Sequence, residues 1–99
     1  MKNKLSITRT DILNFKSETE CQKYIASHKE FIKTLEIEGI QEIHWVRATP
    51  ESLLIFSILT SKEHADVIKG IANKWREQHD FDIHDTLVFD GELIYSFRN

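Results

Sequence analysis

Hydrophobic and polar positions alternate loosely over residues 5–15 (LSITRTDILNF), a stretch rich in β-branched residues that predicts a first strand. Residues 40–48 (IQEIHWVRA) predict a second strand and residues 52–59 (SLLIFSIL) a third, joined by a turn over residues 49–51 in which Pro50 suits the second position. The third stretch is almost unbroken in its hydrophobicity. We therefore expect it to lie in the centre of a sheet, covered on both faces.

Two segments between these strands have hydrophobic residues every three or four positions, which is the spacing of a helix. Ser17 and Glu20 have the spacing of a capping box at the start of the first helix, and Gly39 is a plausible stop after its end. Thr60 and Glu63 repeat that spacing at the start of a second helix, which we expect to end near residue 78. The hydrophobic stripes of the two helices consist of Cys21, Tyr24, Ile25, His28, Ile32 and Leu35, and of His64, Ile68, Ile71, Ala72 and Trp75.

The carboxyl-terminal segment, residues 85–97 (DTLVFDGELIYSF), has Asp90-Gly91 between two hydrophobic runs, which predicts a tight β-hairpin. In this hairpin Leu87, Phe89 and Ile94 share one side, and Val88, Leu93 and Tyr95 share the other. One side can pack on the helices, through Ile25, Ile32, Ile68 and Trp75. The other side has no cover within the chain, and the sequence leaves open which side that is.

The element order is β-α-β-β-α-β with a carboxyl-terminal hairpin extension, which is the order of an α+β, ferredoxin-like fold. Ninety-nine residues suit a single domain, and we expect residues 1–99 to form one. Two helices cover only one face of the antiparallel sheet. The other face is apolar, so we expect it to meet a second copy of the chain across a two-fold axis.

With this element order, the chain resembles the dimeric α+β barrel superfamily and its small domains similar to antibiotic-biosynthesis monooxygenases. The resemblance lies in EIHWVRATPESLLIFSILTSKEHAD and FDGELIYSF. It includes the pattern Ser61, Glu63 and Ala65 at the start of the second helix, and Gly91, Glu92 and Leu93 near the end.

The resemblance implies a dimeric barrel, and a monooxygenase-like domain without an assigned substrate. Haem-degrading members of the superfamily have an asparagine on the first strand and a tryptophan early in the second helix. Here Ile68 stands at the tryptophan position, Trp75 lies two turns later, and Asn14 matches only loosely. This departure argues against haem degradation. We expect no cofactor.

The second predicted strand carries the candidate site. Ile43, Trp45 and Arg47 share one of its faces. If that face lines a pocket between the sheet and the helices, Trp45 can stack on a small planar anionic organic molecule and Arg47 can pair with its carboxylate or enolate. The simpler interpretation makes Trp45 a core residue and Arg47 a solvated or interface residue.

The first helix adds His28 as a candidate general base and Tyr24, one turn earlier, as a candidate substrate-binding residue. Arg47 would stabilise the anion that proton transfer creates, so His28 and Arg47 are the candidate catalytic pair. The alternative is that His28 and Tyr24 are packed core residues. Cys21 is expected to be a buried, inert thiol.

Residues 79–85 (HDFDIHD) concentrate metal-ligating residue types, yet their spacing matches no metal motif. We interpret the segment as a solvated loop anchored by Phe81 and Ile83, and expect no metal.

The net charge of −3 disfavours nucleic acid as a partner, and the third strand lacks the basic and aromatic run of an RNA-binding module. No hydrophobic run is long enough to cross a membrane and no secretory signal is visible, so we expect a cytoplasmic protein. Two functions remain open. One is a small enzyme acting on a planar anion, and the other is a non-enzymatic homodimer that binds a ligand or a protein.

Overall fold

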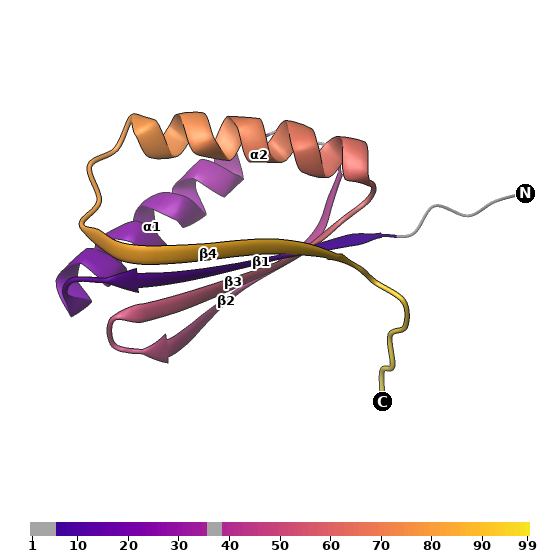
Figure 1. Ribbon diagram of the computed structural model, residues 1–99, viewed down its shortest axis with the longest axis horizontal. Helices are drawn as coiled ribbons and strands as arrows, with labels where there is room; N and C mark the ends of the chain where they lie inside the picture. The colour runs from indigo at the N-terminus through magenta and orange to yellow at the C-terminus, as the bar shows by residue number, and fades with distance from the viewer. Residues whose placement is uncertain (1–5, 36–38) are drawn as a thin grey trace, which may run out of the picture.

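The computed structural model describes residues 6–35 and 39–99. The elements follow the order β1 (Ile7–Phe15), α1 (Glu18–Thr34), β2 (Ile40–Thr49), β3 (Ser52–Leu59), α2 (Lys62–Glu77) and β4 (Ile83–Glu92). The strands form a four-stranded sheet in the order β2-β3-β1-β4, and every neighbouring pair is antiparallel. Both helices lie on one face of the sheet (Figure 1). The predicted α+β, ferredoxin-like fold is therefore confirmed.

The helix-facing side of the sheet holds the core. Leu13 and Phe15 of β1 and Leu53 and Ile55 of β3 are buried there. Trp45 of β2 lies opposite Ile55 in the register and packs against the same cluster. The register confirms that Ile43, Trp45 and Arg47 share one side of β2, and it places this side toward the helices.

Each helix begins at a serine whose side chain accepts a hydrogen bond from a backbone N–H one turn later. Ser17 Oγ accepts from the backbone N–H of Glu20 at 3.1 Å, as predicted. The start predicted for α2 is off by one residue, because its N-cap is Ser61 and not Thr60. Ser61 accepts from the backbone N–H of His64 at 3.3 Å.

The predicted hairpin at Asp90-Gly91 is wrong. Both residues lie inside β4 and pair with β1, Asp90 opposite Arg9 and Gly91 opposite Thr8. Two bonds hold Asp90 in place, since Arg9 donates from Nε and Nη2 to its carboxylate at 2.8 and 2.9 Å. The residues after Glu92 form no strand.

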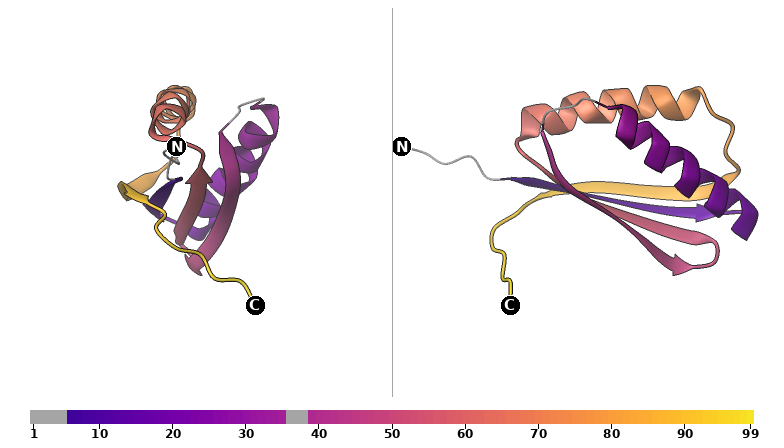
Figure 2. Two further views of the ribbon diagram at one scale, coloured as in Figure 1. Left: turned by 90° about the vertical axis from the view of Figure 1, so that its right-hand side faces the viewer. Right: turned by 180° about the vertical axis from the view of Figure 1, so that it is seen from behind.

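Neither α1 nor α2, the two helices within residues 6–35 and 39–99, lies over the other face of the sheet (Figure 2). The register places Ile12, Leu54, Phe56 and Ile58 on this face, together with the exposed side chains of Val46, Leu87 and Phe89. We call these seven residues the open face. The sequence left open which side of residues 85–97 is uncovered. The register shows that Leu87 and Phe89 belong to the uncovered side and that Val88 points toward the helices.

The carboxyl-terminal tail, residues 93–99, leaves the end of β4 and turns away from the helices (Figure 1). Arg98 Nη2 donates to Glu42 Oε2 on β2 at 3.2 Å. Glu42 lies opposite Ile58 in the register, so the tail lies on the side of the open face. Ile94, Tyr95 and Phe97 of the tail are each at least 77 % exposed. The tail therefore offers more hydrophobic surface on the side of the open face.

Candidate functional site

His28 is the centre of the candidate site. It lies on the side of α1 that faces the sheet and is buried, with 7 % of its surface exposed. The indole N–H of Trp45 donates to its Nδ1 at 2.9 Å. Tyr24, one turn earlier, stacks on its ring with the centroids 5.5 Å apart. The sequence-predicted residues His28, Trp45 and Tyr24 are thus brought together by α1 and β2.

The hydrogen bond from Trp45 fixes the chemistry of His28. An indole N–H can only donate, so Nδ1 is the unprotonated nitrogen and the ring proton sits on Nε2. Burial, together with the smaller effect of the positive charge of Arg76, lowers the pKa of His28 to about 4. At neutral pH His28 is therefore an uncharged hydrogen-bond donor. This geometry favours a donor role over the predicted general-base role, because a base needs a free lone pair.

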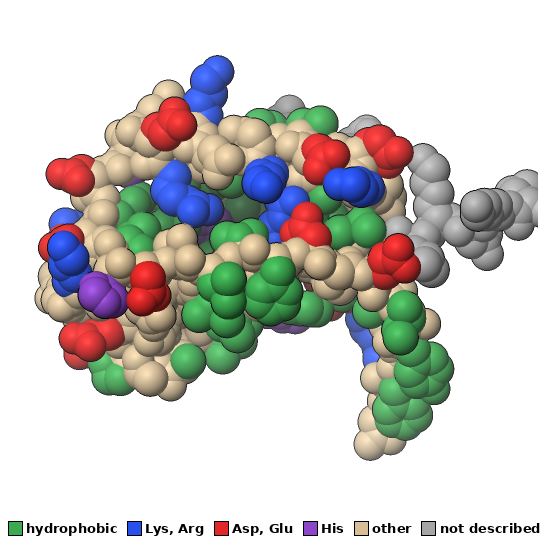
Figure 3. Space-filling model, in the orientation of Figure 1, with side chains coloured by type: hydrophobic (Ala, Val, Ile, Leu, Met, Phe, Trp, Pro, Cys, Tyr) green, Lys and Arg blue, Asp and Glu red, His purple; other side chains and the backbone are tan. Residues whose placement is uncertain are grey.

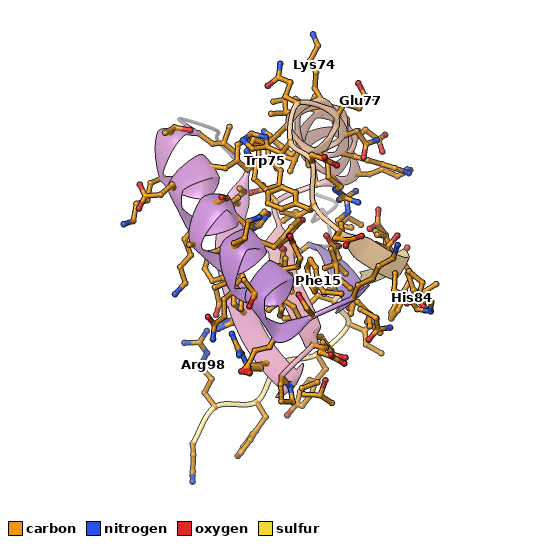
Figure 4. The ribbon with its side chains drawn as sticks, turned by 90° about the vertical axis from the view of Figure 1, so that its left-hand side faces the viewer. Phe15, Lys74, Trp75, Glu77, His84 and Arg98 are labelled. Carbon is orange, nitrogen blue, oxygen red and sulfur yellow. The ribbon has the colours of Figure 1, made fainter. Side chains whose placement is uncertain are left out.

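An aromatic cluster holds His28 and Tyr24 in place. Trp75 meets the Tyr24 ring edge-on at 5.5 Å and the His28 ring at 5.4 Å. Figure 4 shows that Trp75 points from α2 toward the sheet, while its neighbours Lys74 and Glu77 point outward. Burial raises the pKa of the Tyr24 hydroxyl to about 12, so this hydroxyl is not a proton-transfer group at neutral pH.

Arg47 is not part of this cluster. Its exposed side chain lines a separate groove between α1 and β2, beside Lys29 and Lys33. The predicted pairing of Arg47 with His28 in one site is therefore not formed. The alternation of β2 places Arg47 on the helix-facing side, but its side chain is exposed near the end of the strand.

A small cavity of about 40 Å³ lies between the helices and the sheet, next to His28. Its lining is mostly hydrophobic and includes Phe31, Ile43 and Leu59. Its polar lining consists of Arg9, Asp11, His28 and Ser57. Of the four predicted site residues only His28 lines the cavity. Trp45 and Tyr24 do not line it but contact the His28 ring.

Arg9 and Asp11 are the site residues that sequence reasoning missed. Their positions alternate with Leu13 and Phe15 along β1, so all four face the helices. This pattern was the available signal, because two charged residues on the buried side of a strand require partners or a function. Burial raises the pKa of Asp11, and the positive charges of Arg76 and Arg9 oppose that rise.

The surface is hollowed between α2 and β4, where charged side chains surround hydrophobic ones (Figure 3). β4 is almost fully exposed even on its helix-facing side, where Val88 keeps 40 % of its surface accessible. The helices thus cover the middle of the sheet and leave β4 bare.

The residues present do not fit a haem group. Asn14 bonds Ser52 and Asp85 on the side of the sheet that faces away from the helices. Ile68 is buried, and the cavity is far smaller than a porphyrin. Within residues 6–35 and 39–99, no three His, Cys, Asp or Glu side chains are grouped so that they could hold a metal ion. The described helices are also too short or too polar to span a membrane.

Comparison with known proteins identifies the fold. No family model and no curated protein sequence matches the chain. Among solved structures, a dimeric ferredoxin-like protein from an uncultured marine organism is similar over 97 % of this chain and 94 % of its own, with 15 % identity and a TM-score of 0.76.

Two enzymes are also similar in structure. A monooxygenase from Streptomyces coelicolor, solved with the ligand nanaomycin D, matches 96 % of this chain and 93 % of its own at 9 % identity and a TM-score of 0.67. A heme-degrading protein from Mycobacterium tuberculosis, in a heme-free form, matches 98 % of this chain and 100 % of its own at 11 % identity and a TM-score of 0.62. Identities this low establish a shared fold and no more.

Proposed function

We propose that this chain, which has the ferredoxin-like fold of the dimeric α+β barrel superfamily, acts as a homodimer in which each copy binds a small planar organic anion between its sheet and its helices. One observation carries the proposal. Polar groups meet at a cavity whose walls are otherwise hydrophobic, which is the usual composition of a small-molecule site.

The donors at the cavity suit an anion. His28 offers Nε2–H, and Ser57 offers a hydroxyl. Trp45 and Tyr24 fix the direction of the His28 donor, so little conformational freedom is lost when a ligand binds. In this proposal Trp45 and Tyr24 are positioning residues, and Arg47 stays outside the site.

Dimer formation is proposed through the open face. Leu87 and Phe89 keep 57 % and 51 % of their surface exposed, beside Val46 at 48 %. Contiguous hydrophobic patches of this kind are rare on a soluble monomer and mark interfaces. The hydrophobic tail lies on the same side and can add to the contact, and a dimeric ferredoxin-like protein with this fold supports the arrangement.

The test is an NMR titration of the full chain with planar organic acids of increasing size, from acetate to a naphthoate. The indole N–H signal of Trp45 reports on the site because its proton bonds to His28. We expect at least one acid to shift this signal saturably. His28→Phe removes a hydrogen-bond donor and should lower the affinity for that acid about tenfold or more. Arg47→Ala is the control and should leave the affinity unchanged.

The size of the cavity supports a second candidate, a non-enzymatic homodimer whose interior is ordinary core. A volume of about 40 Å³ is well below that of drug-sized ligand pockets, roughly 300–1,000 Å³. The same titration separates the two. If no acid moves the Trp45 signal while the open-face variants still dissociate the dimer, the non-enzymatic function is correct.

A further inference from the structure

Asp11 carries an unusual feature for a buried carboxyl group. Its Oδ1 is fully buried and has no hydrogen-bond partner among the described residues. Nε of Arg76, its strongest positive neighbour, is also buried without a partner in that part of the chain. Buried polar atoms are nearly always paired, so an unpaired acceptor that lines a cavity indicates a site for a hydrogen donor.

The charges around the cavity are already balanced before any ligand arrives. Arg9 is neutralised by its two bonds to Asp90. Asp11 and Arg76 offset one another. An anion that enters next to Asp11 therefore adds an unbalanced negative charge, and two carboxylates in one desolvated site cannot both stay ionised.

The cavity also limits the size of the group that can enter. One water needs about 10–15 Å³ of this kind of space, so about 40 Å³ accommodates roughly three water-sized groups. A carboxylate has three non-hydrogen atoms and is planar. An aromatic ring does not fit, so a larger molecule could place only its carboxylate in the cavity.

These observations lead to one assignment, which rests on the proposed function and refines it. We infer that the cavity takes a short carboxylate, or the carboxylate end of a larger molecule, and that this group shares one proton with Oδ1 of Asp11. The protein takes up one proton from the bulk solvent when the ligand binds, so the bound pair is one carboxylic acid and one carboxylate with a single negative charge. Nε2–H of His28 and the hydroxyl of Ser57 donate to the remaining oxygens.

The pH dependence follows from the charged and titratable groups that face Asp11, which are Arg9 of β1, Asp90 of β4, Tyr24 and His28 of α1, and Arg76 of α2. Guanidinium groups are not deprotonated in proteins, and the pKa of Asp90 is lowered by its bonds to Arg9. His28 and Tyr24 stay neutral around pH 7. Only Asp11 is left to take up a proton, so above its pKa the affinity should fall about tenfold per pH unit.

The experiment uses the full chain and acetate as the probe. We expect the acetate Kd, followed by the Trp45 indole signal, to rise about tenfold per pH unit once the pH exceeds the raised pKa of Asp11. The side-chain carbonyl ¹³C signal of Asp11 should change from its ionised to its protonated position as acetate saturates the site. Asp11→Asn, which has the shape of protonated aspartic acid, should bind acetate with a Kd that does not depend on pH.

Each contrary result has a distinct meaning. Acetate that binds with a pH-independent Kd while Asp11 stays ionised overturns the shared proton, and the proposed function survives. The same holds if acetate fails to bind while a larger acid shifts the Trp45 signal. If no acid binds at any pH, the proposed ligand site itself is wrong. The ¹³C measurement on the wild type keeps the test valid should Asp11→Asn fold poorly.

Discussion

Phe89 on the open face gives the sharpest test of assembly. We expect Phe89→Ala to weaken the dimer without harming the fold of each copy. The Phe89 side chain is 51 % exposed in the single chain, so it contributes little to the packing of its own domain. Surface substitutions of this kind usually change the free energy of unfolding by no more than about 0.5 kcal/mol.

The magnitude follows from the surface that the dimer would cover. An aromatic side chain buries roughly 150–250 Å², so covering the exposed half of Phe89 removes about 100 Å² from water in each copy. At about 25 cal/mol per Å² this contributes about 2.5 kcal/mol, of which alanine retains about a third. A two-fold dimer loses the difference twice, about 3–4 kcal/mol. The dimer dissociation constant should therefore rise by two to three orders of magnitude, roughly.

Sedimentation equilibrium over a range of protein concentrations measures this constant. Val67→Ala is the matched control, because Val67 is 59 % exposed on α2 and lies away from the open face. The control should dissociate like the wild type. A wild-type chain that is monomeric at micromolar concentration, or a Phe89→Ala dimer as tight as the wild type, would refute the assembly.

Other consequences can be measured on the same protein. Asp90→Asn should lower the free energy of unfolding at pH 7 by about 1–3 kcal/mol, because it leaves the Arg9 guanidinium without its charge partner, and the Arg9 side chain is only 8 % exposed. Urea unfolding measures this change, with Asp85→Asn as the exposed control. In the wild type, the lowered pKa of Asp90 means that the pair stabilises the fold above the unfolded pKa of aspartate and is lost as the pH falls through the folded value. The pKa of His28 is lowered to about 4 in the folded protein, so between about pH 6.5 and about pH 4 the unfolded chain takes up a proton that the folded protein does not. The free energy of unfolding should therefore fall by up to about 3 kcal/mol over this range. A His28→Phe variant whose stability in urea shows the same pH slope would contradict this. Gly70→Ala should raise the free energy of unfolding by about 0.5–1 kcal/mol, since an added Cβ meets nothing within 4 Å. Gly39→Ala should destabilise the protein, since the φ of Gly39 is +108° and an added Cβ would lie 2.6 Å from the His64 ring. Thermal unfolding distinguishes the two signs.

The sequence predicted the fold because each helix and strand has a strong local pattern. The period-two alternation of residues 40–48 correctly placed Ile43, Trp45 and Arg47 on one side of β2, and the register shows that this side faces the helices. The hydrophobic stripe of α1 correctly placed Tyr24 and His28 toward the sheet, where both are buried. These positions depend only on periodicity within one element.

The hairpin prediction failed because a long-range contact outweighed a local turn preference. Asp90-Gly91 is a strong turn signal by itself. Here Asp90 is held by Arg9, which is remote in the sequence, and Gly91 lies so close to Thr8 that an added Cβ would meet its Oγ1 at 3.3 Å. β1 thus keeps both residues in β4.

The details of the site were also beyond local patterns. The bond between Trp45 and His28 depends on where α1 crosses β2, which periodicity does not fix. The separation of Arg47 from His28 has the same origin. Arg9 and Asp11 differ, because their alternation with Leu13 and Phe15 was visible in the sequence and marked them as buried charges.

A crystal structure of the chain grown with a saturating organic acid tests the central claim most directly. We predict electron density for the carboxylate between the sheet and the helices, within hydrogen-bond distance of Nε2 of His28 and Oδ1 of Asp11. Density only in the groove beside Arg47, or an ordered core of protein atoms with no acid bound next to His28, would contradict the account.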